Sequence, residues 1–523
     1  MEYNQPSAIV KDLHFGEDGN SKIMAGVNKL ANAVKSTLGA SGKCVIYEDA
    51  MGKPVITKDG VTVAESVVLL DPVENIGATL IKEAAKNTVK EAGDGTTTAT
   101  VLAFSLLKEA LPHIHNGDLR SIKEGISTGT DKVIKYLEKI KKEVSGDMLH
   151  SVATISTNND TELGNIIANA YEAVGKNGVV LMEESENEET YFETVQGAQF
   201  DSGLKSPHLI TNEEKQTAEL ENPYVLLVTS PVSNIRKILP VLEHVIKERR
   251  SLLIIASVDP SPMGALLTNK LKGEIKVNII DVPGFGSTKQ DTIEDLSILT
   301  GAKIINEELG DDMDLIDISV LGTALKSVTD SKNTILTLEN SPDELETRIK
   351  SVEVKITKEQ NPYMKKKLEQ RLAMLSGAVG VIKVGAQSQV ELKEKKDRVE
   401  DAIYAVKAAL QEGIVPGGGV ALRDAANSLK INNIGEELLY KAIVAPYNTI
   451  LANAGILLNE HVEFKKGRGI NVVTGNECNM IQKGIIDPVL VTKTALKNAA
   501  SVVSTIISAD CIISNKRVGD ASY

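Results

Sequence analysis

Apolar side chains recur every three or four positions in several stretches near both ends of the chain, a spacing typical of amphipathic helices. The first such stretch is 21–38, which Gly39 ends. Two short β-prone runs follow, 44–47 and 55–57, and the turn between them predicts a hairpin. Further helices are predicted over 74–91, 99–111, 118–142 and 389–412, and again from Gly417–Gly419 to residue 463.

The middle of the chain has a different pattern, beginning near Val179. A charged segment over 343–375, broken at Asn361-Pro362, predicts a helical hairpin on a surface. Since the ends are helical and the middle is α/β, we expect the central domain to be an insertion, joined through a polar connecting unit near 145–161. Short continuous apolar runs predict buried parallel strands over 225–228, 252–256 and 277–280, with helical stretches near 233–249 and 263–272 between them.

Length and composition describe a large globular protein. A chain of 523 residues exceeds the usual single domain, so roughly two to four domains are expected. The hydrophobic content of 42% is enough for packed cores, and the net charge of −13 argues against a general nucleic-acid binder. Three cysteines lack metal-like spacing, the start does not read as a signal peptide, and no apolar run reaches ~20 residues. We therefore expect a cytoplasmic protein that binds neither nucleic acid nor membrane.

One glycine-rich stretch carries candidate chemistry. Gly93-Asp94-Gly95-Thr96-Thr97-Thr98 runs directly into the apolar segment 99–107. Glycines are unfavourable inside a helix, so the helix is expected to begin with the threonines. Backbone N–H groups at a helix start can bind phosphate, the threonine hydroxyls add hydrogen bonds, and Asp94 suits Mg²⁺ carried by that phosphate. On these residues alone, a turn and an ordinary N-cap is an equal alternative.

Seven motifs occur in order along the chain. They are Thr37-Leu38-Gly39, Lys58-Asp59-Gly60-Val61, Gly93–Thr98, Asp281-Val282-Pro283-Gly284-Phe285-Gly286, Arg398-Val399-Glu400-Asp401-Ala402, Gly417-Gly418-Gly419-Val420-Ala421-Leu422 and Gly484-Ile485-Ile486-Asp487-Pro488. Together they resemble the group I chaperonins, the bacterial and organellar sixty-kilodalton ring chaperones, and the resemblance extends from about residue 7 to residue 515. The archaeal and eukaryotic cytosolic chaperonins share Gly-Asp-Gly-Thr-Thr, but the last two motifs follow the bacterial pattern.

This resemblance implies a multidomain α and α/β subunit. It further implies homo-oligomeric seven-membered rings, single or double, that use ATP hydrolysis to fold non-native polypeptides in a central cavity, with a possible ten-kilodalton-type co-chaperonin as lid. The alternative, from another class, is a specialised scaffold or holdase that keeps the fold without a productive folding cycle. The implied domains are a mostly helical equatorial ATPase domain of residues 1–139 and 412–523, a small α/β intermediate hinge domain of 140–195 and 380–411, and an α/β apical domain of 196–379.

The catalytic roles implied by the resemblance fall on carboxylates. Asp401 would orient the attacking water and Asp59 would flank the γ-phosphate, while Asp94 would hold Mg²⁺. Phosphoryl transfer needs charge neutralisation and a positioned water more than covalent chemistry, so aspartates suit it. Because Asp401 falls in the hinge domain, hydrolysis would wait for domain closure. The sequence has no Walker A pattern, so an ordinary P-loop ATPase is not expected.

The remaining implied positions hold the nucleotide and a monovalent cation. Asp487 would accept hydrogen bonds from the ribose hydroxyls, and residues 471–473 with Ile485 match the adenine end. The K⁺ site is expected at Thr37, Lys58 and Thr97. The nucleotide-binding positions are Thr37, Leu38, Gly39, Lys58, Asp59, Gly60, Asp94, Gly95, Thr96, Thr97, Thr98, Ile155, Ser156, Gly417, Gly418, Gly419, Asn471, Val472, Val473, Ile485 and Asp487.

A surface that binds clients and co-chaperonin is expected on the apical domain, because an exposed apolar patch is what captures unfolded chains. The family typically has aromatic side chains where this chain has smaller or polar ones, which predicts a weaker or narrower client range. Ordinary core packing is the alternative for apolar residues at this spacing. The expected surface residues are Leu204, His208, Leu209, Leu239, Leu242, Met263, Leu267 and Thr268.

The chain departs from the family at positions that join subunits. Ser202 and Gln389 stand where the family often has an intersubunit Arg–Glu pair, and Asn448 and Leu457 stand where well-studied bacterial members place a ring–ring Arg and Glu. Ala40 replaces the usual proline after the glycine, and the Gly-Gly-Met repeats common at bacterial C-termini are missing. The resulting hypothesis is a divergent, virus-encoded member with altered coupling between rings.

Overall fold

The computed structural model divides the chain into two compact units. The first contains Met1–Asn169, Glu184–Thr190 and Val384–Tyr523, and the second contains Ala170–Glu183 and Tyr191–Lys383. A finer division into three domains stays a prediction. The structure describes residues 11–49, 51–114, 118–144, 146–175, 178–185, 187–213, 215–283, 287–307, 310–311, 316–338, 343–358, 361, 364, 368, 371–372, 374–375, 377–457 and 464–515.

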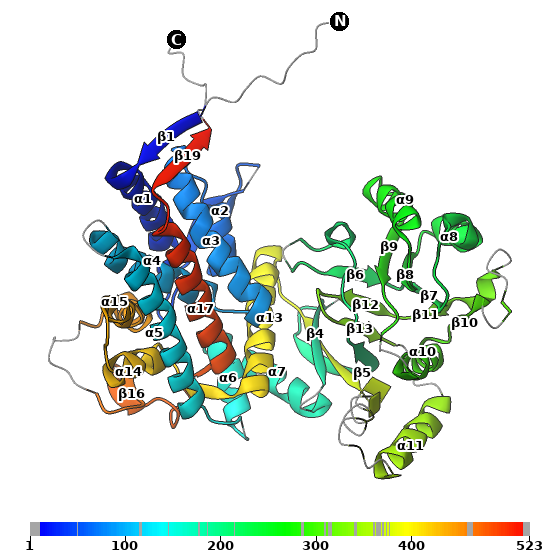
Figure 1. The fold of residues 1–523 in the computed structure, drawn as a ribbon. Helices are drawn as coiled ribbons and strands as arrows, with labels where there is room; N and C mark the ends of the chain where they lie inside the picture. Colours follow the sequence, from blue (N-terminus) through cyan, green and yellow to red (C-terminus); the bar gives the residue numbers. More distant parts are fainter. Residues whose placement is uncertain are drawn as a thin grey trace, which may run out of the picture. The chain divides into compact units, whose positions relative to one another are not determined.

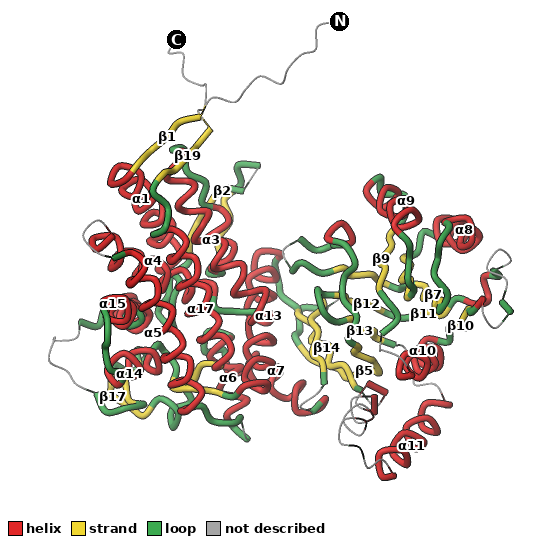
Figure 2. The backbone as a smooth tube through the Cα atoms, viewed as in Figure 1, coloured by secondary structure: helices red, strands yellow, loops and turns green. Residues whose placement is uncertain are grey.

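The first unit is built mainly from helices, as Figures 1 and 2 show. Its helices are α1 (Gly16–Lys35), α2 (Gly60–Ser66), α3 (Pro72–Ala92), α4 (Thr96–Ile114), α5 (Leu119–Ile140), α6 (Met148–Ser156), α7 (Thr161–Val174, which crosses the unit boundary), α13 (Gln389–Glu412), α14 (Val420–Ser428), α15 (Ile434–Ala442), α16 (Ala445–Asn453) and α17 (Val489–Ile506). Its strands are β1 (Lys11–Phe15), β2 (Val45–Glu48), β3 (Pro54–Thr57), β15 (Ile414–Pro416), β16 (Arg468–Asn471), β17 (Asn476–Asn479), β18 (Ile486–Pro488) and β19 (Cys511–Asn515).

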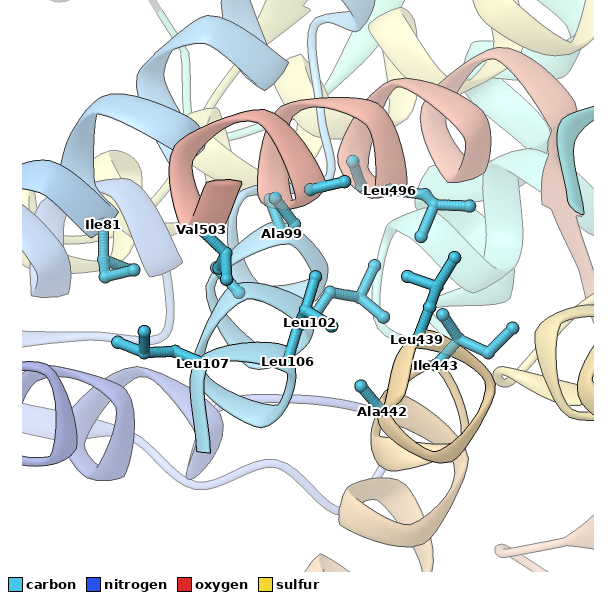
Figure 3. Packing of buried hydrophobic residues seen from close by; sticks show 14 of the residues in the cluster. Ile81, Ala99, Leu102, Leu106, Leu107, Leu439, Ala442, Ile443, Leu496 and Val503 are labelled. Atoms are coloured by element: carbon cyan, nitrogen blue, oxygen red, sulfur yellow. The ribbon is translucent and has the colours of Figure 1, made fainter. Parts of the chain in front are cut away.

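Helix α4 is the centre of the hydrophobic core of this unit. Figure 3 shows Leu102 and Leu106 of α4 facing Leu439 of α15 and Leu496 of α17, and each of these side chains is at most 2% exposed. Burying such a leucine side chain contributes about 1.5–3 kcal/mol relative to leaving it in water. Helix α17 also packs on α3. The core therefore joins a helix from the end of the chain to helices from its beginning.

The turn between α3 and α4 follows from local chemistry. Asp71 caps α3 by accepting hydrogen bonds from the backbone N–H groups of Val73 and Glu74, at 2.8 and 3.0 Å. The helix ends at Gly93, whose φ of 77° is left-handed, a conformation that favours glycine. After Asp94 and Gly95, α4 begins at Thr96, as its row of hydroxyls predicted.

Short strands of the first unit form antiparallel pairs. The hairpin predicted near residues 44–57 is confirmed, with Val45 paired to Thr57 across an antiparallel ladder. Strands β1 and β19 lie side by side in Figure 1 and pair Lys11 with Asn515. Sequence analysis expected helices at both ends of the chain and missed this pair, because its two strands are separated by nearly the whole sequence.

The second unit combines two sheets with helices. Its strands are β4 (Val179–Glu184), β5 (Tyr191–Phe200), β6 (Ala218–Glu221), β7 (Tyr224–Val228), β8 (Ser251–Ile255), β9 (Lys276–Ile280), β10 (Ile304–Ile305), β11 (Gly322–Thr323), β12 (Lys326–Thr329), β13 (Thr334–Thr337) and β14 (Ala378–Val384). Its helices are α8 (Leu239–Glu248), α9 (Pro260–Leu271), α10 (Ser287–Thr300) and α11 (Asp343–Lys358), with 3₁₀ turns η1 (Pro207–Leu209), η2 (Ile235–Ile238) and η5 (Ile318–Val320).

The predicted parallel strands are confirmed as β7, β8 and β9. They form the centre of a sheet of order β10-β7-β8-β9, in which β11 pairs antiparallel with β7. Alternate side chains of β7 enter two different core clusters: Leu226 packs with residues of α8 and α9, and Leu227 packs with residues of α10. Because apolar groups cover both faces, these strands read as continuous apolar runs. The second sheet has the order β4-β14-β5-β13-β12-β6.

Helix α11 is the first arm of the hairpin predicted over 343–375. Pro362, at its expected break, and much of the second arm lie outside the described residues. A buried carboxylate holds both arms to α10: Asp295 Oδ1 accepts from Arg348 Nε at 2.7 Å, and Asp295 Oδ2 accepts from Arg371 Nε at 2.5 Å. Asp295 is fully buried, so this network is the main polar attachment of the hairpin that the structure describes.

Candidate nucleotide site

A cavity of about 880 Å³ opens within the first unit. Its wall contains Asp401 and, with the exception of Gly417, every position predicted to bind nucleotide. These residues come from both ends of the chain and from the segment around Ile155. The size falls in the ordinary range of small-molecule sites, roughly 300–1,000 Å³. The structure thus brings the predicted positions together, while their binding of nucleotide stays a prediction.

The turn that carries Asp94 is pressed against helix α13. Gly95 has a φ of 99°, and a Cβ atom on Gly93 would lie 2.4 Å from the ring of Tyr404. Only glycine permits this approach. Tyr404 lies on α13 one turn after Asp401, so its ring on Gly93 brings Asp401 and Asp94 to the same cavity. Asp94 also accepts a hydrogen bond from the N–H of Gly95.

A second glycine brings the loop of Asp59 against the start of α4. A Cβ atom on Gly60 would lie only 2.2 Å from Thr97 Oγ1. Asp59 caps α2, accepting from the N–H groups of Val61 and Thr62 at 3.1 and 2.7 Å, and also lines the cavity. Asp59 therefore caps α2 and lines the cavity at the same time.

The glycine run forms another part of the cavity wall. Gly418 and Gly419 have φ values of 63° and 77°, and the Gly417 N–H donates to the carbonyl of Ile485 at 2.9 Å. Gly417 itself lies behind the wall, where a Cβ atom would meet Asp487 Oδ1 at 2.9 Å. Asp487 accepts hydrogen bonds from the backbone N–H groups of Gly418 and Gly419, so its carboxylate holds the run in place.

The aspartates concentrate negative charge in the cavity. Burial, followed by the charges of Asp94 and Asp59, raises the pKa of Asp401 well above its ordinary value. Burial, with the Asp59 charge, also raises the pKa of Asp94, although the Gly95 N–H acts in the opposite direction. Burial and Asp94 raise the pKa of Asp487 to about 6. A bound cation would relieve this repulsion.

The donor set fits a magnesium ion that arrives with phosphate. Within the part of the chain that the structure describes, no group of three or more His, Cys, Asp or Glu side chains could hold a metal ion. Mg²⁺ usually keeps several waters and takes one or two carboxylates plus substrate phosphates, so Asp94 suffices as a protein ligand. Thr37, Lys58 and Thr97, predicted for K⁺, all line the cavity.

Comparison with known proteins identifies the family. A model of the TCP-1/cpn60 chaperonin family matches residues 30–517. This chain is a member of the TCP-1/cpn60 chaperonin family. Crystal structures of the chaperonin gp146 from the bacteriophage EL 2 (Pseudomonas aeruginosa), in the presence of ATP-BeFx, align at 22% identity over 97% of this chain and 99% of that chain. Their TM-scores are 0.70 for crystal form II and 0.64 for form I. The chaperonin fold is therefore established, and the viral neighbour is consistent with a divergent group I chaperonin.

The cavity of this chaperonin also contains residues that sequence analysis missed. Arg398 donates from Nη2 to Glu394 at 2.6 Å, and its Nη1 lies 3.7 Å from Asp160. Arg398 was part of a recognised motif but received no role, and within the polar run 154–161 only Ile155 and Ser156 were predicted to bind nucleotide. The other missed lining residues include Asp147, His150, Ser151, Asn158, Asn159, Asn165, Asp397, Tyr447 and Lys483.

The structure corrects two positions of the predicted client surface. Leu209 is fully buried and Leu242 is 7% exposed, because both pack in the core beneath the parallel sheet. Leu239, at 43% exposed, and the exposed His208 and Thr268 keep surface positions. Leu204, Met263 and Leu267 are partly buried against the same core. Client binding by these residues stays a prediction.

The positions that depart from the family pattern have varied surroundings. Ser202 is buried and donates to the carbonyl of Asp281 at 2.8 Å, whereas Gln389 is exposed at the first position of α13. Asn448 is exposed, and Leu457 is 94% exposed.

Among the described residues, no helix of this chaperonin is long and apolar enough to cross a membrane.

Proposed function

We propose that this protein is an ATP-driven ring chaperonin that acts in the cytoplasm. The observation that carries the proposal is the cavity of the first unit, where Asp59, Asp94 and Asp401, from three separate segments, share one wall with a glycine run and a row of threonines. Aspartates that line one cavity match what phosphoryl transfer to water needs, namely a metal ligand and a group that positions water.

In this proposal the chain's own groups divide the work. The N–H groups at the start of α4 and the hydroxyls of residues 96–98 bind the phosphates. Asp94 holds Mg²⁺, which when bound neutralises charge on the phosphate oxygens. Asp401 orients the attacking water. Its raised pKa is lowered again by a nearby cation, which leaves it ionised and able to accept a proton from that water.

Coupling to movement follows from the position of α13. The chain leaves the second unit at Lys383 and enters α13 at Gln389, and α13 leads through β15 directly into the glycine run. A single helix therefore carries Asp401 between the unit boundary and the nucleotide cavity. We propose that closure around ATP shifts this helix and moves the second unit, which holds non-native polypeptide and a co-chaperonin.

The assembly we propose is a homo-oligomer of seven-membered rings, with Mg²⁺ and K⁺ as cofactors. A specialised scaffold or holdase without a productive cycle is the second candidate. The burial of Leu209 and Leu242 favours the scaffold form of this alternative, because it removes apolar area from the predicted client surface. Retention of all three aspartates favours the ATP-driven machine.

Native mass measurement and a refolding assay test the proposal together. The full chain is expected to form a species of seven or fourteen subunits. It is also expected to raise the yield of refolded enzyme, starting from a chemically denatured enzyme, only when ATP is present. The assay is run both with and without a candidate lid protein. The matched control replaces ATP with ADP. A ring that protects the enzyme from aggregation equally in ATP and ADP would support a holdase, a ring without effect in either nucleotide would support a scaffold, and a monomer inactive in both would contradict both candidates.

A further inference from the structure

A buried ion pair lies directly behind the glycine run, on α14. Arg423 is 6% exposed and its neighbour Asp424 is 5% exposed. Arg423 Nη2 donates to Asp424 Oδ1 at 2.7 Å, and its guanidinium carbon lies 4.7 Å from the ring centroid of Tyr447 and 5.0 Å from that of Phe464. Tyr447 itself lines the nucleotide cavity. The pair is thus one layer of side chains away from the proposed ligand.

Both members of the pair bind the backbone where β16 begins. Arg423 Nη2 donates to the carbonyl oxygen of Arg468 at 2.7 Å. Asp424 Oδ2 accepts from the N–H of Gly467 at 2.6 Å. One ion pair therefore binds the backbone N–H of Gly467 and the backbone carbonyl of Arg468, two consecutive residues at the start of β16. Near the other end of β16, residues 470–473 line the cavity.

Strand β16 has little other support from its sheet. Among the described residues it pairs only with β17, in a two-stranded sheet, and an isolated hairpin of two strands is at best marginally stable. Its placement against the cavity must therefore come from side chains. Tyr447 contributes through the buried apolar cluster that it forms with Val420, Leu451 and Met480, because Ile470 of β16 packs against this cluster. The Arg423–Asp424 pair supplies the charged contacts to the backbone.

The energetics favour a positioning role over simple stabilisation. Burying two charges carries a desolvation cost that their attraction often only balances, so apolar residues of similar volume would stabilise the fold equally well. Arg423 Nη1 is also buried without a hydrogen-bond partner among the described residues, a further cost. What apolar residues could not do is bind a carbonyl and an N–H of β16 in a fixed register.

We propose that the buried Arg423–Asp424 pair is a positioning device that holds the wall for the nucleotide base, formed by residues 470–473, at the correct distance from the phosphate site. This inference rests on the proposed function. The pair sets the affinity for the adenine base and the discrimination between bases, and it leaves the contacts to phosphate unchanged.

Calorimetric titration of the full chain, in Mg²⁺, with ADP and separately with inorganic tripolyphosphate tests this inference. Arg423→Met is expected to weaken ADP binding by about tenfold or more, because a small displacement of a binding wall is enough for such a loss. Tripolyphosphate binding is expected to stay within about twofold of wild type, and the preference for ADP over GDP to fall. Arg423→Lys, which keeps charge but loses the fork geometry, is expected to give an intermediate loss.

A double variant and a control separate positioning from folding. Arg423→Met with Asp424→Leu replaces the buried pair by apolar groups and is expected to remain folded, yet to lose ADP affinity like the single variant. Glu436→Gln breaks another ion pair of the same unit, in which Oε1 of the buried Glu436 lies 2.7 Å from Lys132 Nζ, and is expected to leave the ratio of ADP to tripolyphosphate affinity unchanged. Wild-type ADP affinity in the folded double variant would overturn the inference alone. No binding of either ligand by wild type would overturn the proposed function and this inference with it.

Discussion

Replacing Asp401 with asparagine is expected to lower the rate of ATP hydrolysis by about 10²–10⁴-fold, the usual contribution of a positioned general base. Asparagine keeps the shape of the side chain but cannot accept a proton from water. Nucleotide should still bind, because the proposed phosphate contacts of α4 and the Asp94 carboxylate are untouched. Phosphate release in steady state and ADP binding by calorimetry measure the two effects.

The same substitution is expected to stabilise the nucleotide-free protein. Because the pKa of Asp401 is raised in the folded state, the native protein binds this proton more tightly than the unfolded chain does. Above the ordinary aspartate pKa, ionisation of Asp401 therefore lowers stability, and a neutral asparagine removes that penalty at pH 7. Thermal unfolding without nucleotide or Mg²⁺ should show a higher midpoint for Asp401→Asn.

Glu400→Gln is the matched control for Asp401→Asn. Glu400 is adjacent on α13 but does not line the cavity. Its replacement is expected to leave turnover near wild type. Equal turnover in wild type and Asp401→Asn would remove Asp401 from the mechanism, and turnover absent from wild type as well would favour the scaffold.

Replacing Asp295 with alanine is expected to destabilise the second unit by about 3–5 kcal/mol, the range found when one member of a buried ion pair is removed. Two guanidinium groups, those of Arg348 and Arg371, would lose their buried partner. Arg371 is only 8% exposed in its side chain, so water cannot replace the lost carboxylate well. The attachment of the 343–375 hairpin to α10 would weaken first.

Pulse proteolysis in urea, with fragments assigned by mass spectrometry, measures the effect in the second unit separately from the first. The control is Glu124→Ala, which breaks the exposed pair of Arg120 and Glu124 on α5 and is expected to leave the urea midpoint unchanged. An unchanged midpoint for second-unit fragments of Asp295→Ala would show that Glu294 and Asp291, which lie 2.8 and 2.9 Å from Arg348 and Arg371, hold the arginines without Asp295.

How much of the fold can be predicted from the sequence depends on how far apart along the chain the interacting residues lie. Helices such as α13, predicted and found at 389–412, depend on spacing and caps within the segment. The parallel strands were visible because continuous apolar runs report burial on both faces. The pairing of β1 with β19 left no local signal, since its register depends on strands from opposite ends of the chain.

Periodicity reveals which face of an element is apolar, but not what covers it. Leu209 and Leu242 were expected at the surface and lie instead in the core, packed beneath the parallel sheet. The same limit applies to the cavity. Its glycine and aspartate positions came from motif resemblance, whereas Tyr447 and Arg423 gain their roles only from tertiary contacts that no spacing indicates.

The central claim is that aspartates from separate segments converge on one triphosphate in the first unit. Determination of the structure of the full chain with Mg²⁺, ADP and beryllium fluoride tests it most directly. The account predicts ADP in the cavity, the metal on Asp94, and Asp401 facing the fluoride group. Nucleotide bound elsewhere, or a metal without Asp94 among its ligands, would contradict it.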